Sequence, residues 1–110
     1  MRDDDRIRIL HMIDAAEAVA QFIHGKKRED LDTDRLLLFG VVRAIEVIGE
    51  AAGRVSDETQ AATPSVPWAS IIGMRNRLIH GYFDIDANLV WRTTTEEIPS
   101  LHRALRLLLQ

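Results

Sequence analysis

The sequence predicts an all-α protein, a single domain over residues 1–110 that folds as an antiparallel bundle of four principal helices. Apolar residues recur every three or four positions along several long segments, which is the helical period. The connections between these segments are short, which favours antiparallel neighbours. The chain has no internal repeat and no linker long enough to separate two domains.

The first helix is predicted from about residue 5 to residue 23. Gly25 and the basic run 26–28 that follows are typical of a helix end. Its apolar positions lie on one face: Ile9, Ile13, Ala16, Ala20 and Ile23.

A second helix is predicted over residues 35–52, with Asp32 or Thr33 as its cap. It is apolar nearly all round, so we expect it to lie centrally in the bundle. Gly40 and Gly49 each weaken a helix by about 1 kcal/mol relative to alanine. Close approach of a neighbouring backbone would explain why they are tolerated.

Residues 55–67 form a connection, with one helical turn expected at 56–60. A third long helix is predicted from Trp68 to His80, with Gly81 placed as the residue that often follows a helix.

Two further helical segments complete the chain. Asp86 is predicted to cap a stretch that continues through Trp91. The last helix is predicted over residues 96–109, with Pro99 in or near its first turn, where proline is tolerated.

The composition is that of a globular protein, with 46% hydrophobic and 28% charged residues. No apolar run reaches the roughly 18 residues that a membrane span needs, so we expect no membrane association. The charged N-terminal segment lacks the apolar stretch of a signal peptide, so we expect a cytoplasmic protein. At 110 residues the chain is near the low end for burying a core, and a partner subunit would help.

Several chemistries are excluded by composition. Without cysteine there is no disulfide, no thiolate zinc site and no cysteine nucleophile. The net charge of −3 provides no broad basic surface, so phosphate binding must depend on a local arginine cluster. His11, His24 and His102 show no metal-ligand spacing, so we expect no metal and no cofactor.

Arg75 is the conspicuous residue of the third predicted helix. On a helical wheel it falls in the middle of the apolar arc, which consists of Ile71, Ile72, Met74, Leu78 and Ile79. A guanidinium in that position must meet carboxylates, a ligand phosphate or a second subunit.

The second helix offers partners for it. Arg43, Glu46 and Glu50 form a polar stripe at i, i+3 and i+7 on an otherwise apolar helix. An ion-pair network between helices, with Glu46 and Glu50 orienting Arg43 and Arg75, therefore stands beside the functional interpretation.

His80 supplies the second reactive group. It is a helical neighbour of Asn76 at i+4, but a regular helix would hold it about 140° away from Arg75. A site that uses both residues needs a distorted last turn or a second chain.

The two side chains suit cleavage of RNA by its own 2′-hydroxyl. An imidazole transfers protons near neutral pH, and a guanidinium binds phosphate bidentately and stabilises its growing charge. The Arg-x4-His spacing by itself proves little, because Arg6 and His11 have the same spacing. We interpret Arg6 and His11 as a surface pair.

Residues 74–86, MRNRLIHGYFDID, closely resemble the signature of the HepT-like toxins, minimal members of the HEPN superfamily. Arg75, His80 and Tyr82 match the family's Arg-x4-His-x-Tyr core, and Asn76 is the polar residue that usually follows the arginine. The resemblance covers most of the chain: residues 43–51 look like the family's second helix and residues 68–74 like its run into the motif.

This resemblance implies a four- to five-helix homodimer in which two motifs face each other across the interface. It implies a metal-independent RNase toxin, with Arg75 and His80 catalytic and RNA as substrate. It also implies a partner, a minimal nucleotidyltransferase antitoxin of the MntA type, that transfers AMP to Tyr82. A bulky anion two residues from His80 would block the phosphate site.

Taken singly, several of these residues have simpler interpretations. Tyr82 could pack as an aromatic side chain below a helix end, and Trp68, Phe83 and Trp91 are expected in the core or an interface. Arg77 is either a second phosphate contact or a solvated surface charge.

Three functional hypotheses follow. The first is the RNase toxin. The second is a non-catalytic helical subunit that binds nucleotide or a nucleotidyltransferase partner. The third is a structural interaction protein in which Arg75 forms an interface ion pair.

Overall fold

The computed structural model describes residues 1–81 and 84–110. Over these residues the chain is all-α apart from one isolated antiparallel bridge between Ile79 and Ile85, which confirms the predicted class. The elements are α1 (Asp3–Ile23), α2 (Asp30–Thr33), α3 (Arg35–Gly53), α4 (Asp57–Ala62), α5 (Trp68–Ile72), α6 (Met74–Leu78), α7 (Ala87–Arg92), the π-helical turn η1 (Thr93–Glu97) and α8 (Ile98–Leu108).

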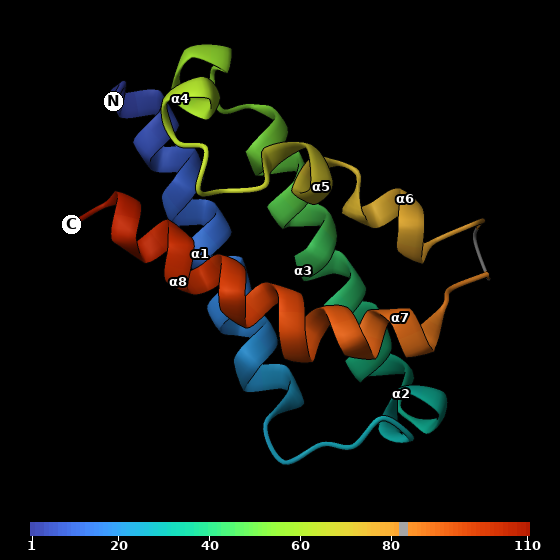
Figure 1. Cartoon of the computed structure of the whole chain (residues 1–110). Helices are drawn as coiled ribbons and strands as arrows, with labels where there is room; N and C mark the ends of the chain where they lie inside the picture. Colours follow the sequence, from blue (N-terminus) through green and yellow to red (C-terminus); the bar gives the residue numbers. More distant parts are fainter. Residues whose placement is uncertain (82–83) are drawn as a thin grey trace.

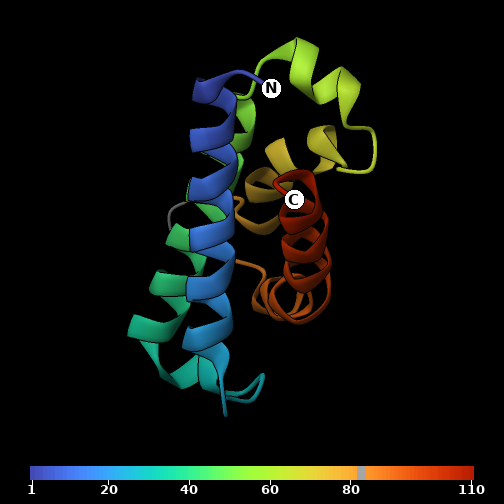
Figure 2. The same cartoon turned by 90° about the vertical axis from the view of Figure 1, so that its left-hand side faces the viewer.

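The helices pack around an antiparallel pair. α1 and α3 run side by side in opposite directions, and the C-terminal segment made of α7, η1 and α8 crosses the front of this pair in Figure 1, with α8 over α1. The view turned by 90° shows the rod that contains α7 and α8 as a separate layer (Figure 2). α5 and α6 pack against α3 beside that rod. None of the described helices has both the length and the hydropathy of a membrane span.

One apolar core joins these elements. Its fully buried side chains come from α1, α3, α6, α7 and α8 and include Ile9, Met12, Ile45, Ile48, Leu78, Val90 and Leu105. Burying each such side chain stabilises the fold by roughly 1.5–3 kcal/mol before entropy is subtracted.

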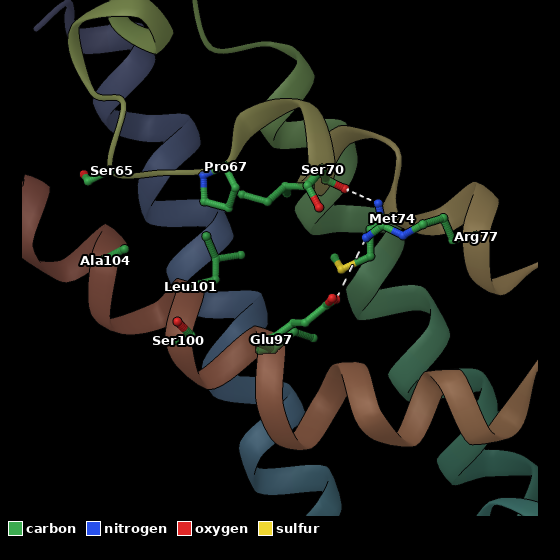
Figure 3. A pocket seen from close by; sticks show the side chains of 11 residues that line it. Ser65, Pro67, Ser70, Met74, Arg77, Glu97, Ser100, Leu101 and Ala104 are labelled. Carbon is green, nitrogen blue, oxygen red and sulfur yellow. Dashed lines mark hydrogen bonds and ion pairs between the residues drawn. The ribbon is translucent and has the colours of Figure 1, made fainter.

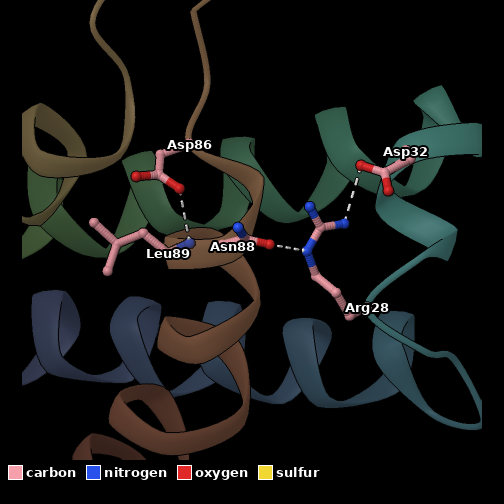
Figure 4. A network of polar contacts seen from close by, with 5 residues as sticks. All are labelled: Arg28, Asp32, Asp86, Asn88 and Leu89. Atoms are coloured by element: carbon pink, nitrogen blue, oxygen red, sulfur yellow. Dashed lines mark hydrogen bonds and ion pairs between the residues drawn. The ribbon is translucent and has the colours of Figure 1, made fainter.

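The start of α3 corrects the predicted cap. Asp32 and Thr33 belong to the one-turn helix α2, and Asp34 is the residue whose carboxylate accepts from the Leu37 N–H at 3.0 Å. The extra turn is stabilised by Arg28, which contacts Asp32 at 3.0 Å and Asn88 of α7 at 2.5 Å (Figure 4).

α3 is central but not fully covered. It contacts α1, α2, α5 and α6, yet Leu36 is 85% exposed and Phe39 51% exposed. An ideal Cβ on Gly49 would lie 3.5 Å from the carbonyl oxygen of Ile71, so the expected backbone approach occurs there. At Gly40 the neighbour is instead the ring of Phe22.

The C-terminal helices form one continuous rod rather than two separate ones. Asp86 caps α7 as predicted, accepting from the Leu89 N–H at 3.1 Å. The last helix does not begin afresh at Glu96, because η1 joins α7 to α8. Pro99 has no N–H and its ring would press on the carbonyl of Thr95, and the wider π turn accommodates that ring.

The junction of α1 and α4 holds a buried carboxylate. Asp5 accepts hydrogen bonds from the Ser56 hydroxyl at 2.7 Å, the Thr59 hydroxyl at 2.6 Å and the Ser56 N–H at 2.9 Å. These donors lower the pKa of Asp5 from 3.8 to about 2. Ser56 also caps α4, so the helical turn predicted at residues 56–60 is confirmed and continues to Ala62.

Candidate active site

The helix predicted from Trp68 to His80 is interrupted twice. Gly73 separates α5 from α6, because glycine is a poor helix former and here ends the first segment. α6 then ends at Leu78, and Ile79 is extended with φ −125° and ψ 116°. The prediction of one regular helix is therefore wrong.

In the loop between α6 and α7, the described residues on either side of positions 82–83 pair with each other. The His80 N–H donates to the Asp84 carbonyl at 2.8 Å, and the Asp86 N–H donates to the Leu78 carbonyl at 2.9 Å. Ile79 and Ile85, β-branched residues that favour extended backbone, pair as the isolated bridge. Gly81 is not the residue after the helix end, and the only glycine with positive φ in the described ranges is Gly25.

Arg75 lies at the surface of α6 and faces α3. Its Nε donates to Glu46 Oε2 at 3.0 Å, and its Nη1 reaches Asn76 Oδ1 at 3.5 Å. The Arg75 side chain is 49% exposed and that of Glu46 25% exposed. The network between helices exists for this pair, but it is open to solvent rather than buried.

A hollow of about 430 Å³ opens beside this pair, which we call the α3–α6 hollow. α3 contributes Phe39, Val42 and Glu46, α6 contributes Arg75, and the loop contributes Ile79, Gly81 and Ile85. Apolar walls with one guanidinium and one carboxylate suit a group that carries both a ring and a negative charge, such as a nucleotide. Sequence reasoning missed Phe39, Val42 and Ile85; for the first two, the surplus of apolar residues on α3 was the available signal.

His80 lies just outside this hollow. It is exposed and belongs to the loop, and it is not among the described residues that line the hollow with Arg75. The last turn is thus distorted, as a site that uses both groups would require in one chain. Tyr82 and Phe83 lie outside the described residues.

The remaining candidates occupy two other places. Arg43 Nη1 lies 3.6 Å from Glu50 Oε1, and both side chains are more than 60% exposed. Arg77 points the other way from Arg75: it donates to the Ser70 carbonyl at 3.1 Å and lies 3.9 Å from Glu97 (Figure 3). That arginine lines a separate cavity of about 180 Å³ between α5–α6 and α8.

The carboxyl groups with shifted pKa values lie away from the hollow. Besides Asp5, these include Glu17 on α1, whose pKa is lowered first by His102 at 3.0 Å and then by Arg106 at 2.7 Å. Among residues 1–81 and 84–110 no group of three histidine, aspartate or glutamate side chains is arranged to hold a metal ion.

The chain belongs to the HepT-like ribonuclease family. The family model described as ribonuclease HepT-like matches residues 12–108. A relative named "Probable ribonuclease HepT" from Thermococcus cleftensis is 38% identical over 88 residues, covering 80% of each chain.

A second relative supports the same family. It is "Putative RNase TTE0752" of Caldanaerobacter subterraneus subsp. tengcongensis, 35% identical over 100 residues, which cover 91% of this chain and 89% of the relative. No solved structure is significantly similar to the chain.

Proposed function

We propose that this protein is a metal-independent endoribonuclease toxin that cleaves RNA with Arg75 and His80. The observation that carries the proposal is the position of Arg75 in a chain of this ribonuclease family. Glu46 orients its Nε at 3.0 Å, while half of the side chain stays exposed at the edge of the α3–α6 hollow. A guanidinium with this exposure can still bind a phosphate through its remaining N–H donors, which supports the proposal.

The chemistry is an attack by the RNA on itself. His80 removes the proton from a 2′-hydroxyl, whose oxygen bonds to the adjacent phosphorus as the bond to the 5′-oxygen breaks. The departing 5′-oxygen takes up a proton, and the products are a 2′,3′-cyclic phosphate and a 5′-hydroxyl. Arg75 stabilises the charge that grows on the phosphate oxygens, with Asn76 as its neighbour.

A homodimer would complete this site. Within one chain His80 lies outside the hollow that Arg75 lines, and a single imidazole must serve as both base and acid. Phe39, which lines the hollow, is 51% exposed, and Leu36, three residues before it on α3, is 85% exposed. Both provide apolar surface that a second copy could cover. Two facing copies would bring two histidines to one phosphate.

The proposed control is a covalent modification. A minimal nucleotidyltransferase of the MntA type would act as antitoxin in the cytoplasm and transfer AMP from ATP to the hydroxyl of Tyr82. The tyrosine oxygen would bond to the α-phosphorus and pyrophosphate would leave. The added anion, close to His80 in sequence, would repel the RNA phosphate.

The test is RNA cleavage by purified protein of unmodified mass in EDTA, comparing wild type with His80→Ala. The control is His24→Ala, which removes an exposed histidine that follows the C-terminal end of α1 and lies neither in the wall of the α3–α6 hollow nor in the loop. We expect His80→Ala to lose cleavage by about 10²–10⁴-fold and His24→Ala to retain it. Absence of cleavage by unmodified wild type would instead favour the nucleotide- or partner-binding subunit.

A further inference from the structure

A second hollow opens in the groove between α1 and α3, which we call the α1–α3 hollow. It has a volume of about 210 Å³. Its lining residues are Arg8 and His11 from α1, and Arg43, Val47, Glu50, Ala51 and Arg54 from α3 and its C-terminal end. Three arginines and one glutamate give it a net charge of +2, whereas the whole chain carries −3.

The positive charge of this hollow is only partly neutralised. Glu50 lies 3.6 Å from Arg43 and offsets part of its charge. Arg8 and Arg54 take part in none of the ion pairs within residues 1–81 and 84–110. Two guanidiniums that line one concavity without a carboxylate partner of their own attract an anion, and their paired N–H donors match phosphate oxygens.

The two hollows flank the same face of α3. At about 100° per residue, Phe39, Val42 and Glu46 point to the side where α6 packs, and Val47 and Ala51 point to the side where α1 packs. Arg43 and Glu50 lie on the exposed face between them.

Arg54 is eight residues beyond Glu46, which corresponds to about 12 Å along the helix axis. One phosphate group cannot contact both positions at this distance, but a nucleic-acid strand with several phosphates can extend from one to the other.

We propose that the α1–α3 hollow binds a backbone phosphate of the RNA strand whose scissile phosphate lies at Arg75. This inference rests on the proposed function, because it assigns the path of the same substrate. Arg8 and Arg54 bind the phosphate, and the RNA strand passes Arg43 where it crosses α3. The contact adds affinity and holds the strand in position, and it takes no part in proton transfer.

The test uses two double variants that remove the same charge. Arg8→Ala with Arg54→Ala empties the hollow of its unpaired cations. Arg92→Ala with Arg103→Ala removes two exposed arginines from the α7–α8 rod and serves as the control. The probe is a single-stranded oligonucleotide of 2′-deoxynucleotides, long enough to span both hollows, which cannot be cleaved through a 2′-hydroxyl.

We expect the hollow variant to weaken binding about tenfold, the effect of one lost charge-assisted contact. The slope of log affinity against log salt should fall by about 0.7, the value for one phosphate of a single strand. The control variant should change either quantity much less. Equal weakening in both variants, or none in the hollow variant, would overturn the proposal; so would loss of binding to an acidic protein partner with oligonucleotide binding unchanged.

Cleavage assays keep this inference distinct from the proposed function. If the RNase is active, the hollow variant should raise KM for a long RNA while kcat and the cleavage of a dinucleotide stay near wild type. A wild-type protein that binds the oligonucleotide through Arg8 and Arg54 but cleaves nothing would refute the catalytic proposal alone. Unfolding midpoints equal to wild type would show that the variants are folded.

Discussion

Asp5 and Arg75 place their charges in opposite settings. The Asp5 side chain belongs to a residue that is 2% exposed, and three donors from Ser56 and Thr59 surround its carboxylate. Arg75 is half exposed, and one carboxylate holds one of its nitrogens. A charge with all its hydrogen bonds made inside the fold serves stability, whereas one that is oriented but left open can bind a ligand.

The largest expected effect is that of Arg75→Ala, which tests whether Arg75 serves ligand binding rather than stability. Arg75→Ala should reduce RNA cleavage by about 10²–10³-fold, because a preorganised donor to the phosphate is lost. Its effect on stability should stay within about 1 kcal/mol, since a solvent-exposed ion pair contributes little. Steady-state cleavage and thermal unfolding measure the two effects, with Arg92→Ala as the control. A large loss of stability would make Arg75 a structural residue.

Asp5→Asn should have the opposite pattern, with an effect on stability and none on cleavage. Asp5→Asn should lower the unfolding midpoint clearly more than Asp4→Asn, the exposed neighbour in the same turn, because the amide cannot accept from all three donors. Cleavage at temperatures where the protein is folded should be unchanged. Equal midpoints for the two variants would refute the structural role of the Asp5 network.

The pH dependence of the unfolding midpoint provides a further test of the role of Asp5. Hydrogen bonds from Ser56 and Thr59 lower the pKa of Asp5 from 3.8 to about 2, so the folded state favours the ionised form. Its contribution is complete above the ordinary aspartate pKa and is lost as the pH falls from about 4 to about 2. The difference in midpoint between wild type and Asp5→Asn should shrink over that range. A constant difference would contradict the assignment.

The smallest expected effect concerns Gly49. Along the chain it lies between Glu46, the partner of Arg75, and Ser56, the partner of Asp5. An added Cβ would lie 3.5 Å from the Ile71 carbonyl oxygen, an ordinary contact, so Gly49→Ala should stabilise the protein by about 0.5–1 kcal/mol. Gly49→Leu should destabilise it, because the longer side chain meets the backbone of α5. Chemical denaturation of both variants measures this, and a destabilising alanine would show that α5 cannot tolerate the methyl group.

Local patterns predicted the first two long helices, the cap of α7 and the helical turn after Ser56. The apolar period of α1, the capping aspartate of α7 and the turn after Ser56 are properties of neighbouring residues, so they could be read from the chain. The family signature likewise depends only on the order of residues in the run that contains Arg75 and His80.

Apart from the break at Gly73, the main errors occurred where contacts outside the predicted element override local preference. His80 left its predicted helix because residues 79 and 85 pair across the loop, and Arg28 stabilised an extra turn before α3 through Asn88 of α7. Pro99 lies in the first turn of α8 as predicted, but η1 continues the rod into that turn from α7.

The sequence by itself determined the all-α class, the family and the candidate catalytic pair. Only the tertiary structure decided that Arg75 faces Glu46 while Arg77 faces Glu97, and that Arg8, Arg43 and Arg54 share one hollow. Helical period fixes which residues share a face, but the partner of that face depends on how whole helices pack. The two hollows therefore depend on the packing of α1 and α6 on either side of α3.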